Sequence, residues 1–278
     1  MTINRSLLNR LRKDERGVSP AISTTILTCA IVVMLLVTVT FANNYLNARI
    51  AENEFSAMKQ FMQTIGLQID DVAWIPGRTQ TLTYTSKYGQ VTFRSPALTY
   101  NFYFDGSLAA SFNVGAVLFN IPISDYSVAN NYFQEIFPSS NSFLQNGTSA
   151  PVCRVFVIEK VPMQDGNYVR IAVAPIVRQL NALINNVAYA RFYLPILNTG
   201  PAPQLSQSVT LTGVNVLHEI FNNVNNVTMT VAFPNSAGMG LTSDFFNFAA
   251  TSQTVILGSN SVVEIYGGIV TVSLGASA

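Results

Sequence analysis

This chain of 278 residues carries little charge: Asp, Glu, Lys and Arg make up 10% of it, against about 25% in an average soluble domain. The formal net charge is +1. The composition therefore gives no electrostatic reason to expect a nucleic-acid partner. A surface so poor in charge must be made polar by Asn, Ser, Thr and Gln.

Residues suited to metal or redox chemistry are equally few. His218 is the only histidine, which excludes a cluster of histidine ligands; with Glu219 beside it, a loop histidine is favoured over a catalytic dyad. Cys29 and Cys153 cannot make a disulfide framework, and we expect both to be buried thiols. The sequence has no Walker-type loop, Gly-x-Ser-x-Gly, Cys-x-x-Cys or dinucleotide-binding fingerprint. We therefore predict no catalytic, cofactor-binding or metal-binding residue and no enzyme activity.

What the chain does have is a long uncharged run near its start. No Asp, Glu, Lys or Arg lies between Val18 and Ala48, and 21–42 supplies a transmembrane helix, which needs ~20 apolar residues. The run follows five basic and two acidic residues: Arg5, Arg10, Arg12, Lys13, Arg16, Asp14 and Glu15. Because basic flanks prefer the cytoplasmic side, we expect the N-terminus inside and the rest of the chain outside.

Three interpretations of this run differ in their processing. An ordinary secretory signal, cut after Ala42, has an apolar region of about 7–15 residues, which is shorter than this run. A plain uncleaved anchor is the second interpretation. The third depends on the segment Gly17-Val18-Ser19-Pro20. Pro20 disfavours helix at Ser19 and Gly17 is conformationally free, so the Gly17–Val18 bond is expected to be extended and accessible to a protease.

The segment resembles the class III signal peptide of archaeal type IV pilin-like proteins, over roughly Arg12 to Ala42. Bacterial pilins carry a Glu where Ile22 stands here, as is usual in the archaeal branch. The resemblance implies cleavage by a prepilin peptidase between Gly17 and Val18, with recognition of Lys13, Arg16, Ser19 and Pro20. It also implies assembly, by an ATPase and a membrane platform, with copies of itself or related pilins.

The helical pattern continues beyond the membrane run and predicts one helix over 18–72. Apolar residues spaced by threes and fours form a stripe, interrupted by Glu52: Phe41, Tyr45, Ala48, Phe55, Met58, Met62, Ile65 and Ile69. Such a stripe packs either on the chain's own domain or on neighbouring helices, and the resemblance favours a helix assembly face. Asp70 and Asp71 are expected to be a solvated helix end, and Trp74 to pack the helix against the next domain.

From residue 78 onward, short alternating segments predict antiparallel strands. Hairpins are expected for 81–85 with 90–94, for 98–104 with 107–112 and for 153–161 with 168–174. Residues 125–137 hold a short helix or remain irregular, and 177–184 are either strand or helix. The fold class is therefore α+β, a long helix followed by a mainly antiparallel β-sandwich. One domain over 78–278 and two domains with a boundary near 200 both remain open.

Two sequons in the exported part, at Asn146 and Asn226, are candidate N-glycosylation sites. Our first hypothesis is a structural subunit. After loss of leader 1–17 it leaves the cytoplasmic membrane for an extracellular filament used in adhesion or surface contact. The second is a monomeric anchored β-domain that binds a ligand or surface. The third is an ectoenzyme with two carboxylates, although the acids are scattered along the chain.

Overall fold

The computed structural model describes residues 20–160, 166–185, 187–201, 207–234 and 240–275. The chain has two compact units, Met1–Ile50 and Ala51–Ala278. Two helices and eleven strands are described: α2 (Pro20–Ala73), β1 (Thr79–Thr83), β2 (Gln90–Phe104), β3 (Ser107–Pro122), β4 (Tyr132–Phe137), β5 (Leu144–Asn146), β6 (Cys153–Glu159), β7 (Tyr168–Pro175), β8 (Val177–Ile184), β9 (Val187–Thr199), β10 (Ser208–Ala232), α4 (Ser243–Phe246) and β11 (Ser252–Leu274). The predicted long helix and strand-rich region are both confirmed.

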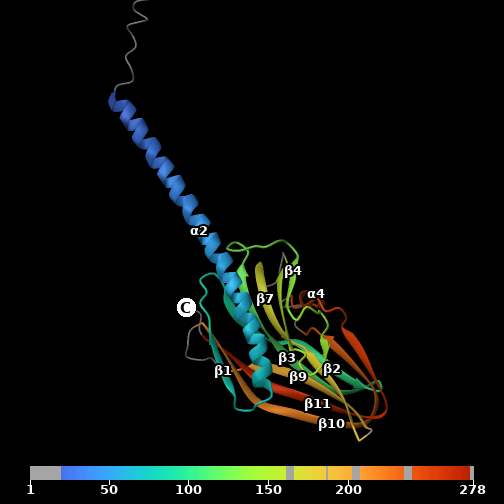
Figure 1. Cartoon of the computed structure of the whole chain (residues 1–278). Coiled ribbons are helices and arrows are strands. Elements are labelled where there is room, and N and C mark those ends of the chain that lie inside the picture. The colour runs from blue at the N-terminus through green and yellow to red at the C-terminus, as the bar shows by residue number, and fades with distance from the viewer. Residues whose placement is uncertain (1–19, 161–165, 186, 202–206, 235–239, 276–278) are drawn as a thin grey trace, which may run out of the picture. The chain divides into compact units, whose positions relative to one another are not determined.

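The strands form one mixed sheet in the order β4-β6-β7-β3-β2-β10-β11-β9-β8-β5, with β1 beside β10 (Figure 1). All pairs are antiparallel except β11 with β9 and β5 with β8. The α+β class with a mainly antiparallel sheet is thus confirmed, while the β-sandwich stays a prediction. Strands on both sides of residue 200 pair within this sheet.

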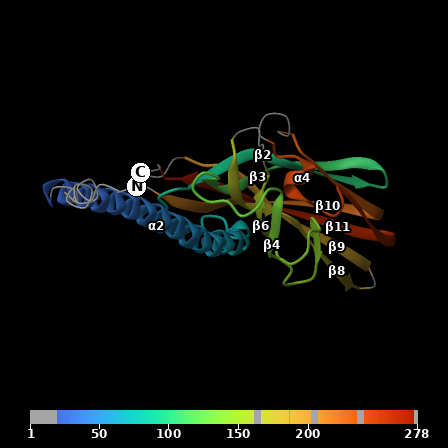
Figure 2. The same cartoon turned by 90° about the horizontal axis from the view of Figure 1, so that it is seen from above.

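The sheet separates two apolar cores. The first contains the buried side of the α2 segment 51–73 together with one face of β3, β6, β7 and the ends of β10 and β11. The second lies on the opposite face and includes Phe245 and Phe246 of α4 (Figure 2). Alternation along β3 shows the division: Val117 and Phe119 belong to the first core, and Leu118 to the second. β6 is buried along its whole length because both of its faces are covered.

Strands β3 and β9 approach each other closely at one glycine. A Cβ at Gly115 of β3 would lie 2.9 Å from the carbonyl oxygen of Leu197 in β9, although β3 and β9 are not neighbours in the strand order. Only glycine permits this approach without displacing the backbone. Gly115 therefore marks a point where two parts of the sheet meet.

Several predicted elements are corrected. Segments 81–85 and 90–94 do not form a hairpin, because β1 pairs with β10 instead. Residues 132–137 form strand β4 and not a short helix, and 177–184 form strand β8. Their pairing with β6 and β9 decides the conformation. The hairpins of β2 with β3 and of β6 with β7 are confirmed.

Candidate functional site

The first compact unit offers an unburied apolar helix. Every residue of α2 from Ile22 to Ile50 is exposed, and the helix is long and apolar enough to cross a membrane. Its hydroxyls are internally satisfied: the Oγ1 of Thr28, Thr38 and Thr40 donate to carbonyl oxygens four residues earlier, at 2.7–2.9 Å. Such back-bonding lets threonines lie in an apolar helix without an unmade hydrogen bond. The segment fits a membrane anchor or a signal sequence.

The predicted helix assembly face divides at residue 50. Phe41, Tyr45 and Ala48 are exposed. The other members of the stripe are buried in the protein's own first core: Phe55, Met58, Met62, Ile65 and Ile69. The structure therefore assigns the distal five to intramolecular packing. They are buried because Gly66 lets the helix approach β6, where a Cβ would lie 3.0 Å from Cγ2 of Val155.

A carboxylate fixes the first turns of this packed segment. Glu54 accepts hydrogen bonds from the backbone N–H groups of Lys87 and Gly89, at 2.9 and 3.1 Å, and a short one from the hydroxyl of Ser86. A loop with successive N–H groups aimed at one point makes an anion-binding concavity. Here the anion is the protein's own side chain, so the loop fastens α2 to the sheet.

The helix end is fastened by charged and aromatic contacts. Asp70 accepts from Nε1 of Trp74 at 2.7 Å and forms an ion pair with Arg178 at 3.2 Å. Trp74 packs edge-on against Tyr193, with ring centroids 5.4 Å apart. Asp71 pairs with Arg78. The prediction for Trp74 is confirmed. Asp70 and Asp71 lie near the helix end with side chains 35% and 40% exposed, as expected, and each also forms an ion pair.

The described residues offer little for catalysis or metal binding. Among them, no group of three or more His, Cys, Asp or Glu side chains is arranged to hold a metal ion. His218 lies in strand β10, not in a loop, and stacks on Tyr266 with centroids 4.4 Å apart. Two cavities, of ≈ 360 and ≈ 300 Å³, have no Asp or Glu in their linings. The carboxylate pair of the ectoenzyme hypothesis therefore finds no support in these two cavities.

Several of the few acids hold turns, loops or neighbouring strands in place. The Glu159 carboxylate accepts from the Ser127 hydroxyl and the Val128 N–H, both at 2.6 Å. Asp105 accepts from the Asn226 N–H at 3.0 Å. Glu264 accepts from Nε of Arg191 at 2.5 Å. These contacts give the acids structural roles, which a sequence without spatial information could not reveal.

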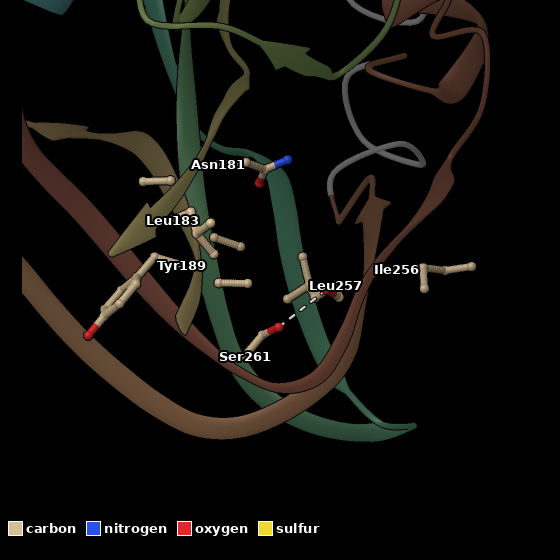
Figure 3. Close-up of a pocket in the computed structure, with 9 residues that line it drawn as sticks. Asn181, Leu183, Tyr189, Ile256, Leu257 and Ser261 are labelled. Carbon is tan, nitrogen blue, oxygen red and sulfur yellow. Dashed lines mark hydrogen bonds between the residues drawn. The ribbon is translucent and has the colours of Figure 1, made fainter. Parts of the chain in front are cut away.

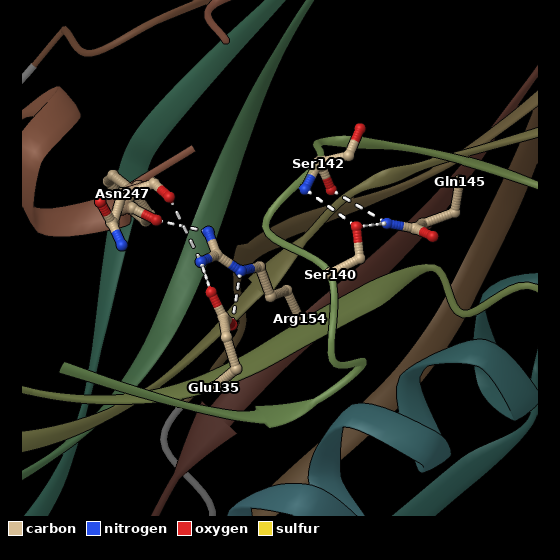
Figure 4. Close-up of polar contacts among 7 residues, drawn as sticks. Glu135, Ser140, Ser142, Gln145, Arg154 and Asn247 are labelled. Carbon is tan, nitrogen blue, oxygen red and sulfur yellow. Dashed lines mark hydrogen bonds and ion pairs between the residues drawn. The ribbon is translucent and has the colours of Figure 1, made fainter. Parts of the chain in front are cut away.

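The side chain of Arg154 is charged and fully buried, with no exposed surface. It donates to both carboxylate oxygens of Glu135 and to the backbone carbonyl of Phe246 (Figure 4). Its guanidinium also lies over the Phe156 and Phe248 rings, at 5.0 and 5.1 Å. Paired and hydrogen-bonded in this way, the buried charge is tolerated and ties β4 and β6 to the end of α4.

Burial raises the pKa of two side chains in this region. The pKa of the Cys153 thiol is raised well above its usual range, first by burial and then by the charge of Asp70. Burial likewise raises the pKa of Tyr100, whose hydroxyl donates to the Pro175 carbonyl at 2.8 Å. Cys153 is a buried free thiol as expected, but Cys29 is exposed on α2 because nothing described covers that segment.

The predicted leader residues lie outside the described part of the chain: Lys13, Arg16, Gly17, Val18 and Ser19. Pro20 is the first residue of α2. The sequon at Asn146 ends strand β5 and is exposed, whereas Asn226 lies half-buried within β10. No family model, curated protein or solved structure matches the chain.

Proposed function

We propose that the protein is a pilin-like structural subunit, which loses residues 1–17 and assembles through its N-terminal helix into a filament at the cell surface. The observation that carries the proposal is the division of α2 at residue 50. Residues 22–50 are exposed and begin with a long apolar run, while the rest of the helix buries one side in the core of a compact domain. An apolar helix on a folded domain requires either lipid or neighbouring helices around it.

The proposed mechanism is a change of surroundings for this helix, from lipid before assembly to neighbouring helices afterwards. Both surroundings are apolar, so burial alone gives little net driving force. An external motor is therefore part of the proposal. Removal of the basic leader, with a net charge of +3 from five basic and two acidic residues, also matters because each Arg or Lys costs about 2.5–3.5 kcal/mol at mid-membrane.

The alternative is a monomeric extracellular β-domain anchored by the same helix, with a ligand or surface as its partner. The apolar pocket of ≈ 360 Å³ lined by Asn181 and Leu183 favours this candidate. In both proposals the precursor lies in the cytoplasmic membrane with its N-terminus inside.

The filament subunit and the anchored monomer can be distinguished by shearing cells that make the protein and looking for filaments without detergent. We expect the wild-type chain in the sheared fraction, and we expect Ile31→Asn to remove it while the precursor remains in the membrane fraction. The matched control is Leu108→Asn, which changes an exposed apolar side chain of β3. Wild-type protein found only in membranes, as single molecules, would refute the filament proposal.

A further inference from the structure

Two strand segments near one cavity each have an edge that pairs with no other described strand. β8 pairs with β9 along one edge, but along the other β5 pairs only with Val177–Gln179. β11 pairs with β10 through Ser252–Ile256, whereas its pairing with β9 begins at Val262. The segments 180–184 and 252–256 therefore each have one edge that pairs with no other described strand.

The cavity is lined by residues of β8, β9 and β11, none of which is charged. It has a volume of ≈ 360 Å³, and its lining includes Asn181, Leu183, Leu257 and Ser261. Figure 3 shows these side chains around the cavity and Ile256 pointing away from it. Two polar lining groups have partners within the protein: Asn181 Oδ1 accepts from Gln179 Nε2 at 2.9 Å, and the Ser261 hydroxyl donates to the Leu257 carbonyl at 3.3 Å.

Neither free edge carries the usual protection. Natural edge strands are blunted by Lys, Pro or inward-pointing charges. The sequences Leu-Asn-Ala-Leu-Ile at 180–184 and Ser-Gln-Thr-Val-Ile at 252–256 contain none of these. Leu183 is 72% exposed. An unprotected edge beside an apolar cavity is the arrangement by which sheets accept an added strand.

Strand β5 shows how such an addition fits. It runs parallel to β8 for three residues, after which Gly147, at φ 129°, donates its N–H to the Gln179 carbonyl at 3.1 Å. Pairing with β5 then stops, and the rest of the β8 edge pairs with no strand in the described part of the chain. The alternating donors and acceptors of that edge match an extended backbone, not a helix.

We infer that this groove binds an extended, uncharged segment of a partner polypeptide, which continues the line of β5 along β8 and places an apolar side chain in the cavity. The lining contains no charged side chain, so a charged residue of the partner at that position would be desolvated without compensation. The affinity for the partner segment comes from main-chain hydrogen bonds to the 180–184 edge. The selectivity among partner sequences comes from every second side chain of that segment, which faces the cavity. This inference does not depend on filament assembly.

The test uses the full chain in detergent micelles and a blocked, fluorescent peptide with the sequence of residues 226–232, which is uncharged and apolar at alternate positions. We expect saturable binding by fluorescence anisotropy and slower amide hydrogen exchange at 180–184. Leu183→Lys should weaken binding at least tenfold. The control Leu108→Lys, on another strand, should change it less than twofold, and a peptide carrying M229E should bind at least tenfold more weakly.

Two results would overturn the inference. One is the absence of saturable binding, or binding that Leu183→Lys leaves unchanged while circular dichroism shows the variant folded. The other is self-association of the chain through 180–184, seen as a dimer in sedimentation with those amides protected before peptide is added. In that case a second copy, and not a separate partner, occupies the edge.

Discussion

Truncating an isoleucine should destabilise the protein in one part of α2 and leave its stability nearly unchanged in the other. Ile65 is 0% exposed and lies in the first core, whereas Ile31 is 49% exposed. Ile65→Ala removes three buried carbon groups, worth about 2.4 kcal/mol at 0.8 kcal/mol each, and leaves a cavity that raises the usual cost to 2–5 kcal/mol. We therefore expect a loss of about 3 kcal/mol in the free energy of unfolding. Ile31→Ala should change it by less than about 0.5 kcal/mol.

The measurement is denaturant and thermal unfolding of the full chain in detergent micelles, followed by the near-ultraviolet signal of Trp74 and the tyrosines. For a unit of this size, about 3 kcal/mol corresponds to a fall in Tm of about 6–12 °C. The reasoning is refuted if Ile65→Ala costs less than about 1 kcal/mol. It is equally refuted if Ile31→Ala costs as much as Ile65→Ala, because the helix would then not be divided between two roles.

Three further predictions concern the domain. Arg154→Met should lower the free energy of unfolding by about 3–5 kcal/mol because it leaves the Glu135 carboxylate unpaired, and adding Glu135→Gln should recover part of the loss in urea titrations. Burial raises the pKa of Tyr100 in the folded state, so the neutral phenol contributes its full stabilisation below the unfolded-state pKa of about 10. Above that pH the free energy of unfolding should fall by about 1.4 kcal/mol per pH unit. Tyr100→Phe should remove this contribution to the pH dependence of stability between pH 10 and 11. Gly268→Ala should cost about 1–3 kcal/mol, measured by thermal unfolding, because its Cβ would lie 2.6 Å from the carbonyl oxygen of Ala73; an unchanged Tm would show that the contact relaxes freely.

Local patterns predict the elements whose signals are contained in a short stretch. The uncharged run and the period of three to four residues place the helix correctly at 20–73. The Asp105-Gly106 dipeptide marks the β2–β3 turn, as such dipeptides do. Both signals depend on a few neighbouring residues, so no long-range information is needed to interpret them.

Pairing between strands far apart in the sequence accounts for the incorrectly predicted strand partners. β1 joins β10, more than a hundred residues away, and the loop that follows β1 is bound by Glu54 instead of turning back directly into β2. The continuous strand β10 crosses a stretch that has no clear alternation around 213–226. The free edge of β8 is likewise invisible in sequence, because it depends on where β5 stops pairing.

The same limit applies to the predicted assembly face. A helical stripe shows that one side of a helix is covered, but not by what. Phe55 and Ile65 meet the protein's own sheet, whereas Phe41 and Tyr45 are exposed. Period alone cannot distinguish these cases, since both halves of α2 follow the same spacing.

N-terminal sequencing of the mature protein from detergent-free, sheared surface material tests the central proposal most directly. A filament subunit released from its basic leader should begin at Val18. A chain that begins at Met1 would retain the leader, and one that begins at Asn43 would have lost the exposed helix. Either result would contradict assembly through residues 22–50.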